Sequence, residues 1–366
     1  MASHHRNSPI LFVGTYTEPE GSKSEGIYVY RMDSMTGQLT FEKVIKGIIN
    51  PSFLDIHPQK NFLYAVNETE SFNEQAGGGV SALSIDPTSD QLVLLNEQIS
   101  HGRHPCYVSV EQTGRFAMAA NYSSGSVAIF PIQSDGRLGA ATDVVQHVGS
   151  SIHPERQTGP HAHCILPDPT NRFAIAVDLG LDKLLIYQLD LERGKLQFHH
   201  EVQVHAGAGP RHLTFDPNRQ HAYLINELDS TITAYGYHSE DARFEEFQRV
   251  SALPENFQDE NLCADIHVSL DGKYLYASNR GHDSIVCFLI DQSTRALTYV
   301  AHTSTGGREP RNFAIDPSGT FLLVANQKSD NIVTFKIDPD TGQLSKTEYQ
   351  VEISMPVCIK FAHLSS

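Results

Sequence analysis

A short apolar string followed by a polar residue recurs seven times along this chain. The seven copies occupy residues 11–16, 63–68, 117–122, 174–179, 222–227, 275–280 and 322–327. The steps between their last residues are 52, 54, 57, 48, 53 and 47 residues, each the length of a four-stranded propeller blade with its loops. The repeat therefore predicts an all-β fold, a seven-bladed β-propeller.

Each repeat also has a fixed internal order. An apolar run such as 212–215 precedes a turn at 216–219, then comes the recurring string, and then an alternating run such as 231–235. A fourth strand follows Asp- and Gly-rich turns such as 338–342. Four strands per repeat make one blade, so residues 1–366 are predicted to form a single domain.

The two ends of the chain hold incomplete repeats. Residues 10–45 provide three strands without an innermost one, whereas residues 355–363 match the innermost-strand pattern of 209–217 and have no strands after them. We therefore expect the first blade to be closed by strands from both termini, which removes free sheet edges.

Charge and composition indicate which classes of molecule this protein binds. The formal net charge is −16 and no block of five or six basic residues occurs, which argues against nucleic-acid binding. The apolar run at 10–13 is too short for a signal sequence or a membrane span. A small-molecule partner is expected, and no feature indicates an oligomeric state.

The five cysteines are widely spaced and form no C-x-x-C pair. Their spacing matches no structural zinc motif. They are predicted to be reduced thiols in a cytoplasmic protein.

Equivalent positions of all blades should converge on the central mouth. At the start of the innermost strand these positions hold Ser52, Cys106, His163, Arg211, Ala264, Arg311 and Val357. After the second strand they hold Tyr16, Glu68, Tyr122, Leu179, Glu227, Arg280 and Gln327. These side chains are polar where a core would be aliphatic, and this composition is typical of an active site.

The two rings suggest a chemistry. Arg211, Arg280 and Arg311 would form a cationic spot that attracts an anion. His163 and Glu227 are the pair suited to proton transfer, with either able to serve as the base. Without a G-x-S-x-G motif, direct attack by water on an ester or lactone is favoured.

Two further groups receive less weight. The ring Thr15, Asn67, Asn121, Asp178, Asn226, Asn279 and Asn326 is predicted to build turns. A metal site is the minority interpretation, because no tight ligand motif is found among the residues His101, His104, His161, His163, Asp265 and His267. No cofactor is predicted.

Several segments carry a family resemblance that extends over essentially the whole chain. They are residues 12–17, 159–163, 178–182, 209–213, 226–227, 264–267, 278–280 and 309–311. Together they resemble the seven-bladed β-propeller lactonase family of cytosolic 6-phosphogluconolactonases, which is related to the fungal carboxy-muconate cyclising enzyme.

The resemblance implies a hydrolase that opens 6-phospho-glucono-1,5-lactone to 6-phosphogluconate in the pentose phosphate pathway, without a metal. The family's catalytic quartet falls on His163, Arg211, Glu227 and Arg280. The residues predicted to bind the phosphorylated lactone are Arg311, His161, Tyr122, Gln327 and His104.

Two rival functions remain open. A cycloisomerase or a lactonase for a non-phosphorylated carboxylate would use the same groups. A non-catalytic interaction scaffold is also possible for a propeller, because fold alone does not determine function.

Overall fold

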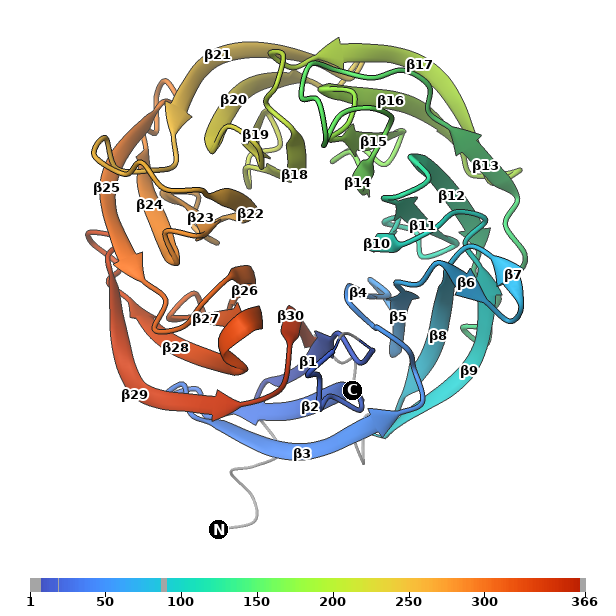
Figure 1. Ribbon diagram of the computed structural model, residues 1–366, viewed down its shortest axis with the longest axis horizontal. Coiled ribbons are helices and arrows are strands. Elements are labelled where there is room, and N and C mark those ends of the chain that lie inside the picture. Colours follow the sequence, from blue (N-terminus) through green and yellow to red (C-terminus); the bar gives the residue numbers. More distant parts are fainter. Residues whose placement is uncertain (1–7, 19, 87–90, 363–366) are drawn as a thin grey trace.

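The computed structural model describes residues 8–18, 20–86 and 91–362, and it forms a ring of seven four-stranded antiparallel sheets (Figure 1). The innermost strands are β4 (Leu54–Ile56), β10 (Pro105–Val110), β14 (Ala162–Pro167), β18 (Pro210–Phe215), β22 (Leu262–Val268), β26 (Pro310–Ile315) and β30 (Pro356–Ala362). The second strands are β1 (Ile10–Thr15), β5 (Phe62–Asn67), β11 (Phe116–Asn121), β15 (Phe173–Asp178), β19 (His221–Asn226), β23 (Tyr274–Arg280) and β27 (Phe321–Asn326).

The outer half of each blade completes the ring. The third strands are β2 (Gly26–Met32), β8 (Gly79–Ile85), β12 (Ser126–Pro131), β16 (Lys183–Asp190), β20 (Thr231–His238), β24 (Ser284–Ile290) and β28 (Asn331–Ile337). The fourth strands are β3 (Leu39–Lys46), β9 (Leu92–Ile99), β13 (Asp143–Gln146), β17 (Lys195–Gln203), β21 (Arg243–Ser251), β25 (Leu297–Ser304) and β29 (Leu344–Glu352). A small hairpin, β6 (Ser71–Phe72) with β7 (Gln75–Ala76), and the 3-10 turn η2 (Gln327–Ser329) lie in loops.

The predicted seven blades are confirmed, and so is the closure of the first blade by both termini. Strand β1 pairs with β2 on one side and with β30 on the other, with Ile10 opposite Ala362 and Val13 opposite Ile359. In Figure 1 the blue and red ends of the chain meet in this blade. The pairing makes the first blade a complete four-stranded sheet in the order β3-β2-β1-β30.

Burial explains why the inner strands read as continuous apolar runs. All six residues of β27 are buried because neighbouring blades cover both faces of the sheet. The outer strand β29 instead alternates between buried or half-buried and exposed positions over most of its length.

All five cysteines are buried free thiols. In the described part of the chain, no helix has the length and apolar character needed to span a membrane.

Most innermost strands carry a β-bulge near their start. The residues left unpaired at single bulges are Cys106, His163, Arg211, Arg311 and Val357. In blade five, Ala264 and Asp265 of β22 stand opposite the single residue Ser278 of β23, so this innermost strand also has one extra residue. A bulge bends the strand and re-aims a side chain, so the first predicted ring is a ring of bulged residues at the channel.

Six blades have a turn between the innermost and second strands, and a side chain caps each of these turns. Both oxygens of Asp316 accept bonds: Oδ1 from the N–H groups of Thr320 and Phe321, at 2.8 and 2.6 Å, and Oδ2 from Ser318. The equivalent caps are His57, Glu111, Asp168, Asp216 and Ser269.

Replacing Asp316 by alanine should lower the free energy of unfolding by about 2 kcal/mol, because buried backbone donors lose their acceptor. Urea denaturation followed by circular dichroism measures this change. The exposed turn residue Asp338, which also accepts two backbone bonds, is the matched control. Asp338→Ala should cost less, and equal losses would contradict the importance of burial.

Candidate active site

Two connected cavities occupy one end of the central channel. The outer one has a volume of about 200 Å³ and is lined by Glu68, Cys106, Tyr122, Arg156, His163, Glu227, Leu262, Arg280 and Arg311. The inner one is narrow, shares four of these residues, and adds Tyr16, Ser52, Phe53, Arg211, His212, Asn312 and Val357. Most members of the two predicted rings therefore lie together.

Glu227 is the centre of the site. Its Oε2 accepts bonds from Nε of Arg211 at 3.0 Å and from Nη2 of Arg280 at 2.7 Å, while its Oε1 accepts from Nη2 of Arg156 at 2.5 Å. The carboxylate is only 4% exposed. Three guanidinium groups thus share one buried acid.

The charge balance sets the protonation state of Glu227. Burial acts to raise the pKa of this carboxyl, but the positive charges of Arg280, Arg211 and Arg156 outweigh it and lower the pKa to about 2. Glu227 is therefore a carboxylate at any ordinary pH, and such a weakly basic group is a poor proton acceptor.

Arg311 differs from the other three arginines. Within the described residues its guanidinium makes no hydrogen bond or ion pair, and it lies over the ring of Tyr16 at 5.5 Å from the centroid. It lines both cavities. Its N–H groups are thus available to an anionic or carbonyl oxygen.

His163 lines both cavities as well. Its ring lies edge-on to Tyr122 and His212, at centroid distances of 5.5 and 5.3 Å. Burial, followed by the charge of Arg211, holds the pKa of His163 well below its ordinary value of 6.5. Of the two ring nitrogens, only Nδ1 has a hydrogen-bond contact with a side chain in the described structure, with Sγ of Cys106 at 3.7 Å. Nε2 therefore remains available to a reactant.

Cys106 does not supply a thiolate. Burial raises the pKa of this thiol well above its ordinary value, and the charge of Glu68 acts in the same direction. The protonated thiol is a weak nucleophile. The site accordingly favours attack by water over a covalent thioester.

Tyr122 lies at the cavity as predicted, whereas three other predicted residues line neither cavity. His161 stacks on Tyr122 and its Nδ1 donates to the Tyr122 carbonyl oxygen at 3.0 Å. Gln327 begins the turn η2. His104 is bonded through Nδ1 to Ser123 at 2.8 Å.

Two charged lining residues, Arg156 and Glu68, were not predicted as site residues. Arg156 comes from the loop 147–161, which Gln157 anchors by donating to the Leu179 carbonyl oxygen at 2.8 Å. The longest repeat step, 57 residues, spans this loop and was the available signal of an insertion. Glu68 stood in the second ring, and it accepts bonds from Tyr16 and Ser52.

The ring of Asn and Asp residues is structural, as predicted. Asn121 and Asn279 donate to carbonyl oxygens of neighbouring segments, and Asp178 caps the turn at Gly180 and Leu181. In residues 8–18, 20–86 and 91–362 no cluster of three or more His, Cys, Asp or Glu side chains is placed to hold a metal ion.

Comparison with known proteins agrees with this geometry. Residues 10–361 match the family described as lactonase, 7-bladed beta-propeller. A 6-phosphogluconolactonase of Bacillus subtilis is 38% identical over 97% of this chain and 98% of its own length. A 6-phosphogluconolactonase of Formosa agariphila is 35% identical, with 94% and 97% covered. The structure of the periplasmic gluconolactonase of Pseudomonas aeruginosa superposes with a TM-score of 0.91 at 35% identity, covering 98% and 99% of the two chains.

The Glu227 cluster predicts a specific acid dependence of stability. Because the folded pKa of about 2 lies below the ordinary 4.5, the ionised carboxylate stabilises the fold above pH 4.5, and this contribution is lost as the pH falls towards 2. Wild type and Glu227→Gln should differ by about 3 kcal/mol at pH 6. The difference should shrink steadily below pH 4.5.

Urea unfolding at a series of pH values measures this difference. Glu255→Gln, at an exposed position, corrects for the loss of one carboxylate. A difference that is constant from pH 6 to pH 3 would show that Glu227 is not held by the arginines.

Proposed function

This chain belongs to the lactonase family of seven-bladed β-propellers, and on that premise we propose that it hydrolyses 6-phospho-glucono-1,5-lactone to 6-phosphogluconate. It is a hydrolase of a sugar lactone, which excludes the non-catalytic scaffold. The observation that carries the proposal is the neutral imidazole of His163 beside Arg311.

His163 is the proposed general base. Its pKa lies well below 6.5, so the ring is neutral at pH 7, and in the tautomer with its proton on Nδ1 the lone pair lies on Nε2. Glu227 is saturated by three guanidinium groups and is too weakly basic for this role. Glu227 instead holds Arg211 and Arg280 in place.

Arg311 and Arg280 are the proposed binders of the lactone carbonyl oxygen. Both line the outer cavity with His163. Positive groups fixed in advance around a developing oxyanion stabilise the transition state without reorganisation. Arg311 can give all its N–H groups to substrate, whereas Arg280 is partly bonded to Glu227 and to the backbone.

The proposed reaction is a hydrolysis in two steps. His163 takes a proton from water while the water oxygen attacks the carbonyl carbon, and the carbonyl oxygen becomes an oxyanion. The tetrahedral intermediate then collapses, the bond from the carbonyl carbon to the ring oxygen breaks, and the imidazolium protonates that oxygen. The product is the open-chain hydroxy acid.

The charge of the site supports a phosphorylated substrate. Four arginines and two glutamates line the cavities, so with neutral His163 the mouth carries a net charge of +2 inside a protein of −16. The sequence predicted Arg311 among the residues that bind the phosphorylated lactone. We assign Arg311 to the carbonyl oxygen and the phosphate to Arg156, whose side chain is 32% exposed, whereas those of Arg211 and Arg280 are below 10%.

A non-phosphorylated lactone is the second candidate substrate, because a gluconolactonase from Pseudomonas aeruginosa shares the fold at 35% identity. That relative is periplasmic. We place this protein in the cytoplasm, since its five cysteines are all free thiols. Cell fractionation with an antibody to the protein tests this location.

Replacing His163 by glutamine should lower kcat for the phosphorylated lactone by roughly 100- to 10,000-fold, because the base is lost. The acid limb of the wild-type pH profile should lie below pH 6.5, where the buried imidazole becomes protonated, and the variant should lack it. Stopped-flow acid release measures both quantities after subtraction of spontaneous hydrolysis.

His200→Gln is the matched control, because this half-buried histidine lies on the outer strand β17. It should keep the wild-type rate and profile. An unchanged kcat in His163→Gln would remove His163 as the base.

The substrate class is tested by comparing 6-phospho-glucono-1,5-lactone with glucono-1,5-lactone. Wild type should prefer the phosphorylated compound in kcat/KM. Arg156→Gln should raise KM for that compound by roughly tenfold, as expected for one lost charge-assisted contact, and should change KM for the plain lactone by less than twofold. Equal changes for both substrates would contradict a phosphate contact at Arg156.

A further inference from the structure

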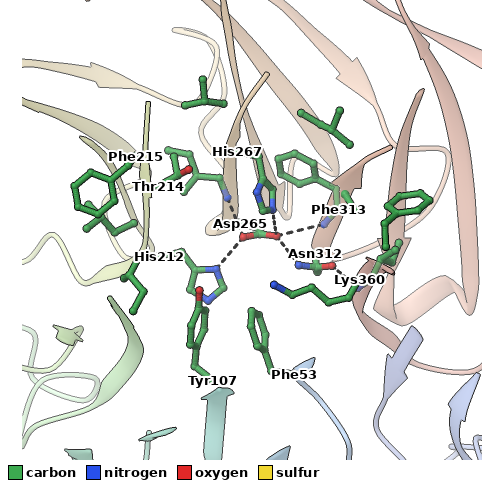
Figure 2. Close-up of a pocket in the computed structure, with 18 of the residues that line it drawn as sticks. Phe53, Tyr107, His212, Thr214, Phe215, Asp265, His267, Asn312, Phe313 and Lys360 are labelled. Atoms are coloured by element: carbon green, nitrogen blue, oxygen red, sulfur yellow. Dashed lines mark hydrogen bonds and ion pairs between the residues drawn. The ribbon is translucent and has the colours of Figure 1, made fainter. Parts of the chain in front are cut away.

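A third cavity lies at the opposite end of the channel, with a volume of about 380 Å³. Three residues, Phe53, His212 and Asn312, line both this cavity and the inner cavity of the active site. Figure 2 shows Asp265 at its centre, between His212, His267 and Asn312. None of these polar side chains is used by the proposed reaction.

Asp265 is fully bonded. Its Oδ1 accepts from Nδ1 of His212 at 2.9 Å, and its Oδ2 accepts from Nε2 of His267 at 2.9 Å and from Nδ2 of Asn312 at 2.5 Å (Figure 2). The backbone N–H of Ile266 also donates to Oδ1. Asp265 follows Ala264 on the innermost strand β22 as His212 follows Arg211 and Asn312 follows Arg311 on theirs, and all three side chains line this cavity.

His212 connects this carboxylate to the active site. Nη1 of Arg211 donates to Nε2 of His212 at 3.3 Å. A guanidinium cannot accept a hydrogen bond, so Nε2 must be the unprotonated nitrogen. The proton of the neutral ring therefore lies on Nδ1, where it meets Asp265. The carboxylate selects the tautomer that Arg211 requires.

Arg211 has its orientation determined by these contacts. Nε donates to Glu227, and Nη1 donates to the Ala264 carbonyl oxygen at 2.5 Å and to His212. Three of its five N–H groups are thereby used. The Nη2 amino group has no partner among these contacts. The Arg211 side chain lines the inner cavity together with His163 and Arg311.

We propose that Asp265 and His212 are positioning residues for Arg211. They hold its guanidinium at the inner cavity of the active site, which His163 and Arg311 also line. The inference rests on the proposed function. Asp265 acts through His212 and touches no reactant. The arrangement is the carboxylate–imidazole pair that elsewhere orients a functional group from behind, here with an arginine as the group it orients.

The decisive comparison uses two substitutions of His212. His212→Leu removes the acceptor and should lower kcat by roughly 10- to 100-fold with KM changed less than threefold, the range expected when an orienting partner is lost. His212→Gln offers an amide oxygen to Arg211 and an amide N–H to Asp265, so it should recover most of the lost kcat.

A double-mutant cycle with Asp265→Asn tests whether Asp265 acts through His212. In wild type this substitution should reduce kcat. In the His212→Leu background it should cause no further loss, because the connection is already broken. His221→Leu is the matched control, since His221 faces Asp216 at 3.6 Å on the second strand β19, away from both cavities, and should leave kcat unchanged.

The tautomer can be measured on the unaltered protein. In ¹⁵N-histidine-labelled wild type, the His212 ring should show a protonated Nδ1 and a bare Nε2, and a protonated Nε2 would overturn the proposal even if the variants fail to fold. Equal loss of kcat in His212→Leu and His212→Gln, or full kcat in His212→Leu, would also overturn it. An inactive wild type would instead refute the proposed lactone hydrolysis.

Discussion

The β-bulge at the start of the innermost strand is the constraint on which the site depends. Seven similar sheets packed around an axis would otherwise point equivalent apolar residues at the centre. Each bulge leaves one residue out of the pairing and frees its side chain for the channel. His163, Arg211 and Arg311 all occupy such positions. The closed ring holds the blades together, and the bulges bring the functional side chains into the channel.

Closure and charge work together at the mouth. Because β30 pairs with β1, the first blade is complete and the bulged residues are held in a closed ring of seven blades. Buried guanidinium groups at that spacing would repel one another, and burial together with Arg280 and Arg311 already lowers the pKa of Arg211 to about 10. Glu227 compensates this repulsion, which explains why the most acidic carboxylate of the mouth is unsuited to proton transfer.

The repeat pattern predicted the blades, their closure and most of the lining residues, because strand order and turn chemistry are local properties of the chain. Arg156 was not predicted because it lies in the loop 147–161, the longest of the connections between a fourth strand and the next innermost strand. His161 stood near a ring position, yet its Nδ1 is bonded to the Tyr122 carbonyl oxygen, and Gln327 stood in the second ring but begins the turn η2 and lines neither cavity. Choosing between His163 and Glu227 as the base required the number of arginines around Glu227, which only the assembled mouth reveals.

Differences among otherwise equivalent blades indicate where function was built. In blade five, Asp265 stands at the position that His212 and Asn312 hold in the neighbouring blades, directly after the residue of the first predicted ring. A carboxylate that only connected blades would need no particular tautomer of His212. Since Nε2 of His212 must accept from Arg211, the carboxylate at this position has a consequence on the active-site side of the channel. The hydrogen bonds of Asp265 and His212 therefore have two results: they connect neighbouring blades, and they orient Arg211.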